Sequence, residues 1–454
     1  MAIEPTQPAG LDLRENAFCF SSDFSAHLAR KYWEKLPVLI ERPFAAPLIG
    51  PEEIFRAVLK ASDQHLAGDD NVVLSFFTEH SQQIAEVGKF LPRAPDKTMA
   101  GYAKRIGRKL CGQRFALIIQ DIHIYAPEVW LRFREFLRGL SQFIDIPAEK
   151  TKASVFIGDY EKTPAGLHVG NSGNFKFVVE GRKRLRLWPD KFFRGKKGIH
   201  GSLDFERFLP AATTLEGGPG DVIYWPSDQW HSGEAVGGPA VSVSLALYVK
   251  QRTSGLMDLW RETAEATEQR LAALASKNDA GFDARAVTQE VKRISQMQRR
   301  AAAAFSKAIA RPEIGESLAV TWLNRATSFG FSKVPDSLPH GKLKDNAVIR
   351  AHPHCPIIWL AGRDNEVVCS ANGHAFSVTA HPEVLKLLRE LNRGNALRVG
   401  ALIKQYSGDA QVGRVTFKAH SEGIRALLEK LYCLRAISSS LPSFPPVKIS
   451  ELSA

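Results

Sequence analysis

The chain has 454 residues, of which 44% are hydrophobic and 24% charged, so it can bury sizeable cores over two or three domains. It contains no run of 18 apolar residues, and "MAIEPTQPAGLDLRENAF" at its start lacks the basic and apolar segments of a signal peptide, so we expect a cytoplasmic protein without a membrane partner. The five cysteines form no CxxC pair, which is typical of unpaired thiols in a reducing compartment. The net charge of +12 favours an acidic partner, such as a peptide, a nucleic acid or an anionic cosubstrate.

The first half of the chain changes from mixed to β-rich character. Residues 23–62 favour a helix, a short strand and a second helix that begins at Pro51, and residues 114–147 favour a strand followed by a helix from near Pro127. Short β-rich segments separated by turn residues then run from 153 to 250, a pattern typical of a sandwich or barrel. We therefore expect residues 1–125 to form an α/β part that completes a β-rich core at 126–250.

The second half of the chain is predicted to be largely helical. Residues 251–310 favour two long helices divided by a turn at Gly281, which suit either the interface of a homodimer or an intradomain hairpin. Residues 311–440 begin with short β candidates and continue with helix, turn at Gly394, helix and a further helix from near Ser421, a pattern typical of a winged-helix module. Residues 441–454 favour a flexible tail.

Two histidines stand in contexts that favour a metal site. His168 comes just before the β-rich stretch "NFKFVVEGRKRLRLWP", and His231 follows "GDVIYWPSDQW" much later in the chain. A jelly roll brings a residue of a late strand opposite one of an early strand in this way. Two neutral imidazoles that face each other suit Fe(II), Mn(II) or Zn(II).

Lys183 is the candidate for binding an anion near these histidines. Side chains alternate along a strand, so Lys183 shares a face with Phe175, Phe177 and Val179 if the strand runs unbroken. A lysine on an apolar inward face needs an anion, which a carboxylate of a bound dicarboxylic acid would supply. A bend at Gly181 would instead change the register and leave Lys183 in solvent.

Residues 20–250, most clearly 154–248, resemble the cupin-type Jumonji C oxygenases, which use Fe(II) and 2-oxoglutarate. The resemblance rests on the two histidines, on the lysine and on the entry segment "ARKYWEKLPVLIERPF". The later helices resemble, more loosely, the C-terminal part of the bacterial ribosomal oxygenases. The resemblance implies an α+β protein with a double-stranded β-helix (jelly-roll) core, a helical extension and a C-terminal winged-helix module.

The resemblance also implies the roles of individual residues. His168 and His231 would bind Fe(II), Lys183 would pair with the distal carboxylate of 2-oxoglutarate, and Asn174 and Thr163 would line the cosubstrate pocket. The family modifies side chains of proteins or peptides, so the implied partner is a protein or peptide, for example a ribosomally made precursor with an acidic leader. Nucleic acid is disfavoured, because acidic residues are interleaved with the basic ones of the C-terminal module.

Gly170 departs from the family's pattern, in which an aspartate or glutamate follows the first histidine by two positions. In the related halogenases a glycine or alanine replaces this acid and chloride binds in its place, so Gly170 favours a halogenase. A hydroxylase whose third ligand is water, Asp159 or Glu161 is the second interpretation, and a cupin that binds without catalysis is the third. Gly170 could also serve the turn "VGNSGN", because glycine permits a positive φ.

Overall fold

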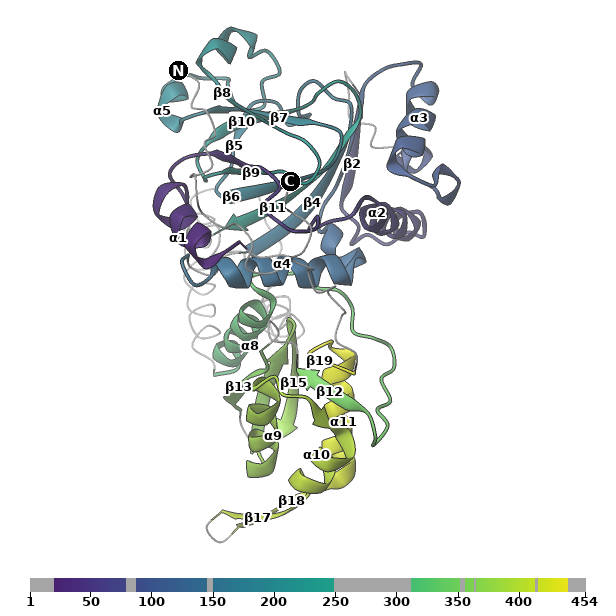
Figure 1. The fold of residues 1–454 in the computed structure, drawn as a ribbon, viewed down its shortest axis with the longest axis vertical. Helices are drawn as coiled ribbons and strands as arrows, with labels where there is room; N and C mark the ends of the chain where they lie inside the picture. Colours follow the sequence, from purple (N-terminus) through teal and green to yellow (C-terminus); the bar gives the residue numbers. More distant parts are fainter. Residues whose placement is uncertain are drawn as a thin grey trace, which may run out of the picture.

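The structure is a computed structural model that describes residues 20–78, 87–144, 150–248, 312–351, 356–362, 365–412 and 415–439. The long helices predicted for 251–310 and the tail at 441–454 lie outside these residues. Within them, no helix is both long enough and apolar enough to cross a membrane. A β-rich part and a smaller C-terminal part lie one above the other, with helix α4 between them (Figure 1).

Two antiparallel sheets face each other in the β-rich part (Figure 1). The larger has seven strands in the order β1 (Val38–Ile40), β9 (Val222–Trp225), β6 (Gly173–Glu180), β11 (Ala240–Tyr248), β4 (Lys150–Gly158), β3 (Phe115–Ile119) and β2 (Leu74–Thr78). The smaller has four, in the order β5 (His168–Val169), β10 (Trp230–Ala235), β7 (Lys183–Trp188) and β8 (Thr213–Gly217). Leu185, Leu187 and Leu215 of the smaller sheet pack against Ile223 and Trp225 of the larger. The predicted mixed architecture with a β-rich core is therefore confirmed.

Helices cover the outer face of the seven-stranded sheet. They are α1 (Ser22–Lys31), α2 (Pro51–Leu66), α3 (Met99–Lys109) and α4 (Pro127–Leu140), with the short turns η1 (Val87–Phe90), η2 (Ala94–Asp96) and η3 (Ile122–Tyr125). The short elements α5 (Asp190–Phe193) and η4 (Glu206–Ala211) lie beside the four-stranded sheet instead, where they pack around Trp188 of β7. The predicted helix start at Pro127 is confirmed. The apolar side of α4 packs on β6, where the Phe136 ring lies 5.1 Å from that of Phe175 and 5.6 Å from that of Phe177.

Of the two alternatives for the segment that leads to Lys183, the structure has the bend at Gly181 and not the unbroken strand. Strand β6 ends at Glu180 and β7 begins at Lys183 in the other sheet. The break occurs at Gly181, whose φ is +68° and where a Cβ would lie 2.5 Å from the carbonyl oxygen of Pro239. Only glycine fits this turn. Phe175, Phe177 and Val179 consequently belong to the core beneath the helices, and Lys183 does not share their face.

The C-terminal part has its own core and its own small sheets. Its elements are α8 (Pro312–Ser328), β12 (Val348–Ala351), β13 (Ile358–Ala361), β14 (Glu366–Ala371), β15 (His374–Thr379), α9 (Pro382–Asn392), β16 (Leu397–Arg398), α10 (Val399–Tyr406), β17 (Gly408–Val412), β18 (Val415–Ala419), α11 (Ser421–Cys433) and β19 (Ile437–Ser438). Gly394 has a φ of +73° at the end of α9, as the predicted turn requires. The predicted order of helices is confirmed, and its assignment to the winged-helix class stays a prediction.

Buried hydrogen bonds join the two parts. Arg134 of α4 is fully buried and donates to the Asn372 side chain and to the Thr327 carbonyl. Thr151 of β4 donates from its backbone to the Gly330 carbonyl at 2.8 Å and from its hydroxyl to the Phe329 carbonyl at 2.8 Å. These contacts fix the end of α8 against the seven-stranded sheet and its helix α4.

Candidate functional site

His168 and His231 face each other on neighbouring strands. They are directly opposite residues of the antiparallel pair β5 and β10, and their ring centroids lie 4.1 Å apart with 56° between the ring planes. Opposite residues of such a pair project from the same face of the sheet. A hydrogen bond of 2.8 Å from the backbone N–H of Asp228 to the Gly170 carbonyl ties the two segments together beside the rings. The structure thus brings together the two histidines that the sequence indicated.

Each imidazole is oriented by a hydrogen bond to the backbone carbonyl of the residue two positions earlier. Nδ1 of His168 lies 2.9 Å from the Gly166 carbonyl oxygen, and Nδ1 of His231 lies 2.9 Å from that of Gln229. A carbonyl oxygen only accepts hydrogen bonds, so Nδ1 carries the proton in each ring and the Nε2 lone pair stays available. This arrangement orients histidines as metal ligands in other proteins.

The protonation of the pair also fits a metal. Burial lowers the pKa of His168 below its usual value and lowers that of His231 well below it, and electrostatic interactions with His168 and Lys176 lower the pKa of His231 further. Both imidazoles are therefore neutral at physiological pH, which is the form that binds a metal. The pair fits a divalent ion such as Fe(II), Mn(II) or Zn(II).

Neither the backbone nor the packing requires glycine at position 170. Gly170 is not among the residues with positive φ, so the interpretation that the turn needs a left-handed glycine is wrong. A Cβ there would meet only the Ser172 hydroxyl oxygen, at 3.8 Å. Gly173, three positions later, is different, because its Cβ would lie 2.8 Å from a carboxylate oxygen of Glu34. The space beside the histidines at Gly170 is consequently open to a side chain or to a small ligand.

The two acids considered as replacement ligands are engaged elsewhere. A carboxylate oxygen of Asp159 accepts a hydrogen bond of 2.9 Å from the Phe115 backbone, and Glu161, which is two-thirds exposed, forms an ion pair of 2.6 Å with Arg114. Among the described residues, no group of three or more His, Cys, Asp and Glu side chains could hold a metal ion. The expected contribution of Asp159 or Glu161 is therefore not supported, and a metal at the pair would draw its other ligands from small molecules.

Lys183 is buried despite the bend at Gly181, so the expectation that such a bend would leave it in solvent is also wrong. The residue is 2% exposed, and its Nζ donates to the Tyr160 hydroxyl at 2.8 Å and lies 4.0 Å from the centroid of that ring. Burial lowers the pKa of Lys183 well below its usual value, and the positive charge of Lys176 lowers it further. The negative charge of Asp159 raises the pKa of Lys183 by a smaller amount, and the hydrogen bond of the lysine goes to the Tyr160 hydroxyl.

Lys176 is a second buried lysine between the sheets. Its side chain alternates with those of Phe175 and Phe177 and points away from the helices. Its Nζ donates to the Ser244 hydroxyl at 2.8 Å and lies 4.2 Å from the ring centroid of Phe156 and 5.8 Å from that of Trp225. The Trp225 ring lies 5.1 Å from that of His231, so the lysine and the histidine share one neighbour.

The two polar residues expected to line the cosubstrate pocket are both buried. The Asn174 amide donates to the Ser172 carbonyl at 2.8 Å at the start of β6. The Thr163 hydroxyl accepts from the Gly233 backbone N–H at 2.8 Å and donates to the Gly233 carbonyl at 3.0 Å. Thr163 therefore fastens its loop to β10, whereas Asn174 lies two positions before Lys176 on the same face of β6.

Lys176 and Tyr160 were not predicted from the sequence. The sequence pattern could have indicated Lys176, because it is a charged residue at an even offset from Asn174 within the apolar run "NFKFVVE". No pattern indicates Tyr160, since the loop that brings it to Lys183 has no periodic hydrophobicity. Both lie within the interior that the histidines border.

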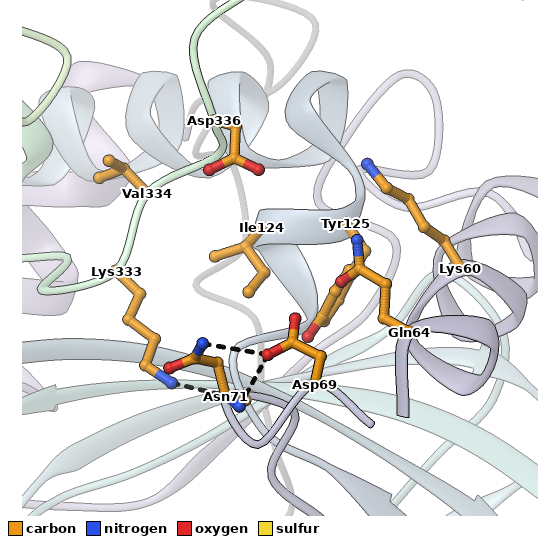
Figure 2. A pocket seen from close by; sticks show the side chains of 9 residues that line it. All are labelled: Lys60, Gln64, Asp69, Asn71, Ile124, Tyr125, Lys333, Val334 and Asp336. Atoms are coloured by element: carbon orange, nitrogen blue, oxygen red, sulfur yellow. Dashed lines mark hydrogen bonds between the residues drawn. The ribbon is translucent and has the colours of Figure 1, made fainter. Parts of the chain in front are cut away.

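A separate cavity of about 310 Å³ lies where α2 and η3 meet the segment that follows α8 (Figure 2). Its charged lining residues are Lys60, Asp69, Lys333 and Asp336. Asp69 accepts hydrogen bonds from Asn71, whose carbonyl accepts one of 3.2 Å from Lys333. None of the expected site residues lines this cavity.

Comparison with known proteins gives structural matches of low sequence identity. No family model matches the chain, and no curated protein matches its sequence. The structure is similar to that of YcfD, a ribosomal oxygenase from Escherichia coli, with 15% identity, a TM-score of 0.45 and coverage of 90% of this chain and 96% of the other. YcfD in complex with cobalt and 2-oxoglutarate matches with 16% identity, a TM-score of 0.46 and coverage of 91% and 97%. Oxalate decarboxylase from Bacillus subtilis matches over 23% of each chain, with 17% identity and a TM-score of 0.16.

Proposed function

We propose that this chain is an Fe(II)- and 2-oxoglutarate-dependent oxygenase that modifies a C–H bond of a peptide or protein. The observation that carries the proposal is the facing pair of His168 and His231, in which both Nδ1 atoms donate to backbone carbonyls and neither Nε2 atom has a hydrogen bond to the part of the chain that the structure describes. The pair would hold the metal, and Lys183, supported by the Tyr160 hydroxyl, would bind the distal carboxylate of 2-oxoglutarate. When bound, the metal with 2-oxoglutarate and O2 would supply the oxidation that cleaves the C–H bond, in which one oxygen atom of O2 goes to the substrate and the other to the succinate formed from 2-oxoglutarate with release of CO2.

The protein's own contribution is to position these groups and to keep water out. The backbone carbonyls of Gly166 and Gln229 fix the ring orientations, and burial keeps the imidazoles neutral. Asn174, buried at the start of β6, adds an amide to the same interior. Thr163 acts on the site indirectly by holding the loop that carries Tyr160 and His168 against β10.

Halogenation is a second candidate for the reaction of the same site. The observation that favours it is the open space at Gly170, where neither a positive φ nor a close neighbour calls for glycine. Chloride bound there would supply the negative charge that the absent acid would have carried. A hydroxylase with water in that place is the alternative, and a cupin that only binds a peptide would show no turnover.

The test is reconstitution of the full chain with Fe(II) under anaerobic conditions, followed by oxygen and 2-oxoglutarate with or without chloride. Succinate formation that is lost in His168→Ala and His231→Ala supports the oxygenase, and its absence from wild-type protein in the presence of peptide substrates favours the binding-only cupin. A crystal soaked in bromide distinguishes the two reactions. An anomalous peak beside the metal at Gly170 supports halogenation, and a water or carboxylate in that place contradicts it.

A further inference from the structure

The cavity of about 310 Å³ at the junction of the two parts has the size and the lining of a small-molecule site. Such sites have volumes of about 300–1,000 Å³ and combine apolar walls with a few polar groups. The apolar walls here are Ile124, Val334 and the ring of Tyr125, and the other lining side chains are polar or charged (Figure 2). A ligand in this cavity would contact both parts of the protein. The cavity is separate from His168 and His231, neither of which lines it.

The Tyr125 hydroxyl is the lining group that most clearly lacks a partner. Tyr125 is 7% exposed, and its hydroxyl makes no hydrogen bond within the described part of the chain. Figure 2 shows this hydroxyl turned toward Asp69. Asp69 accepts both hydrogen bonds of Asn71 with one carboxylate oxygen, so among the described residues its other oxygen has no partner. A buried polar group without a partner is rare in proteins, and it indicates that a bound group completes its hydrogen bonding.

The charges around this hydroxyl favour a cation. Burial and three negative charges raise the pKa of Tyr125 to about 12. The charges belong to Asp69, Asp121 and Asp336. The positive charge of Lys333 is already engaged, because its Nζ lies 3.8 Å from a carboxylate oxygen of Asp121 and donates a hydrogen bond of 3.2 Å to a backbone carbonyl. The inner end of the cavity is therefore electronegative, and an ammonium group there would pair with Asp69 and donate to the Tyr125 hydroxyl.

The rim of the cavity offers one charged group of each sign. Lys60 of α2 and Asp336, which follows α8, are both exposed, and neither side chain has a hydrogen bond or ion pair within the described part of the chain. An ammonium and a carboxylate on one carbon atom of a ligand would pair with Asp336 and Lys60, respectively. Figure 2 shows Ile124 between Asp336 and Asp69, so an aliphatic chain along Ile124 would connect the rim to the inner end.

We propose that this cavity binds a free diamino acid such as lysine. Its α-ammonium and α-carboxylate pair with Asp336 and Lys60 at the rim, and its methylene chain packs on Ile124. Its terminal ammonium is bound by Asp69 and the Tyr125 hydroxyl, so each of the three charges of the ligand meets an opposite charge. The proposal is independent of the proposed oxygenase, because these residues do not belong to the histidine site and binding needs neither metal nor 2-oxoglutarate.

Isothermal titration calorimetry of the full chain, with a chelator and without iron or 2-oxoglutarate, tests the ligand class. Lysine is expected to bind at least about tenfold more tightly than norleucine, which has the same chain without the terminal ammonium, because a hydrogen-bonded ion pair is lost. A difference of at least about tenfold is also expected for cadaverine, which lacks the carboxylate. Norleucine binding equal to that of lysine, or no binding of lysine, would overturn the inner ammonium site. Cadaverine binding equal to that of lysine would overturn the recognition of an amino acid. None of these results bears on the oxygenase, since no metal is present.

Variants assign each end of the ligand to its residues. Tyr125→Phe keeps the ring in the cavity wall, and it is expected to weaken lysine binding by about tenfold without affecting norleucine, which has no ammonium at that end. Asp336→Asn and Lys60→Met are expected to weaken the binding of both ligands alike. Asp63→Asn and Lys104→Met change exposed residues outside the cavity and are the matched controls, with an expected effect below about twofold. Unchanged lysine binding in Tyr125→Phe, or an equal loss for lysine and norleucine, would overturn the placement of the terminal ammonium.

Discussion

The rings of His168 and His231 lie 4.1 Å apart because each histidine occupies the same register position of the antiparallel pair β5 and β10. Their Nδ1 atoms donate to carbonyls two residues earlier in the chain, just before each strand begins. The pair is thus oriented by short-range backbone contacts before any ligand binds. Such preorganisation lowers the cost of metal binding, since neither ring needs to change tautomer or turn.

Removal of one imidazole should weaken the binding of a divalent metal. We expect His168→Ala and His231→Ala each to reduce Mn(II) affinity by at least about tenfold, because one of only two protein ligands is lost. Electron paramagnetic resonance of Mn(II) titrated into the full chain measures the free ion. His340→Ala removes an exposed histidine of the C-terminal part and serves as the control. Unchanged affinity in both site variants would place the metal elsewhere.

Gly170→Asp should restore the missing carboxylate. The side chain has room, because its Cβ would meet only the Ser172 hydroxyl oxygen at 3.8 Å. We expect Mn(II) affinity to increase by about tenfold or more, as a third, charged ligand joins the pair. Gly170→Asn has the same shape without the charge and should leave the affinity close to that of wild type. Weaker metal binding by Gly170→Asp would show that the carboxylate cannot reach the ion.

Binding of 2-oxoglutarate to the proposed oxygenase site should weaken as the pH rises above neutrality if Lys176, between the two sheets, also faces the cosubstrate. Burial lowers the pKa of Lys176 to about 7, so above this pH the empty site holds a neutral amine that must take up a proton when the anion binds. The affinity contributed by Lys176 should then fall by about tenfold per pH unit above pH 7. His168, His231, Lys183 and Tyr160 also face this interior. Isothermal titration calorimetry at several pH values measures the affinity of wild type and of Lys176→Met, and the difference between the two pH profiles is the contribution of Lys176. Parallel profiles would contradict a contribution of Lys176 to binding.

Local sequence patterns predicted part of the candidate site, namely the two histidines that a β-sheet pairing brings together. The contexts of His168 and His231 sufficed because antiparallel strands bring such positions together. The burial of Lys183 was predicted for the wrong reason, since a positive-φ turn at Gly181 moves the lysine to the other sheet. There it is buried by contacts with a distant loop, through Tyr160. Which residues meet across two sheets depends on packing between segments, and periodicity within one segment does not encode it.

Acid should destabilise the junction between the two parts of the protein through His123. Its Nε2 donates to the Lys333 carbonyl at 2.9 Å, its ring packs 4.4 Å from that of Phe331, and it is 1% exposed. Burial lowers the pKa of His123 to about 4, against 6.5 for the ordinary side chain. The unfolded chain thus binds a proton more readily than the folded one between these values. The resulting stability is fully present above about pH 6.5 and is lost as the pH falls toward 4, by about 3 kcal/mol in total.

His123→Gln tests this origin of acid sensitivity. Glutamine keeps an N–H donor for the Lys333 carbonyl and does not titrate in this range, so the free energy of unfolding should fall less steeply between pH 6.5 and 4 than in wild type. Urea unfolding at several pH values, followed by tryptophan fluorescence, measures the difference. His340→Gln removes an exposed histidine as the control and should follow the wild-type profile. An identical pH dependence in all three proteins would assign the acid sensitivity to other groups.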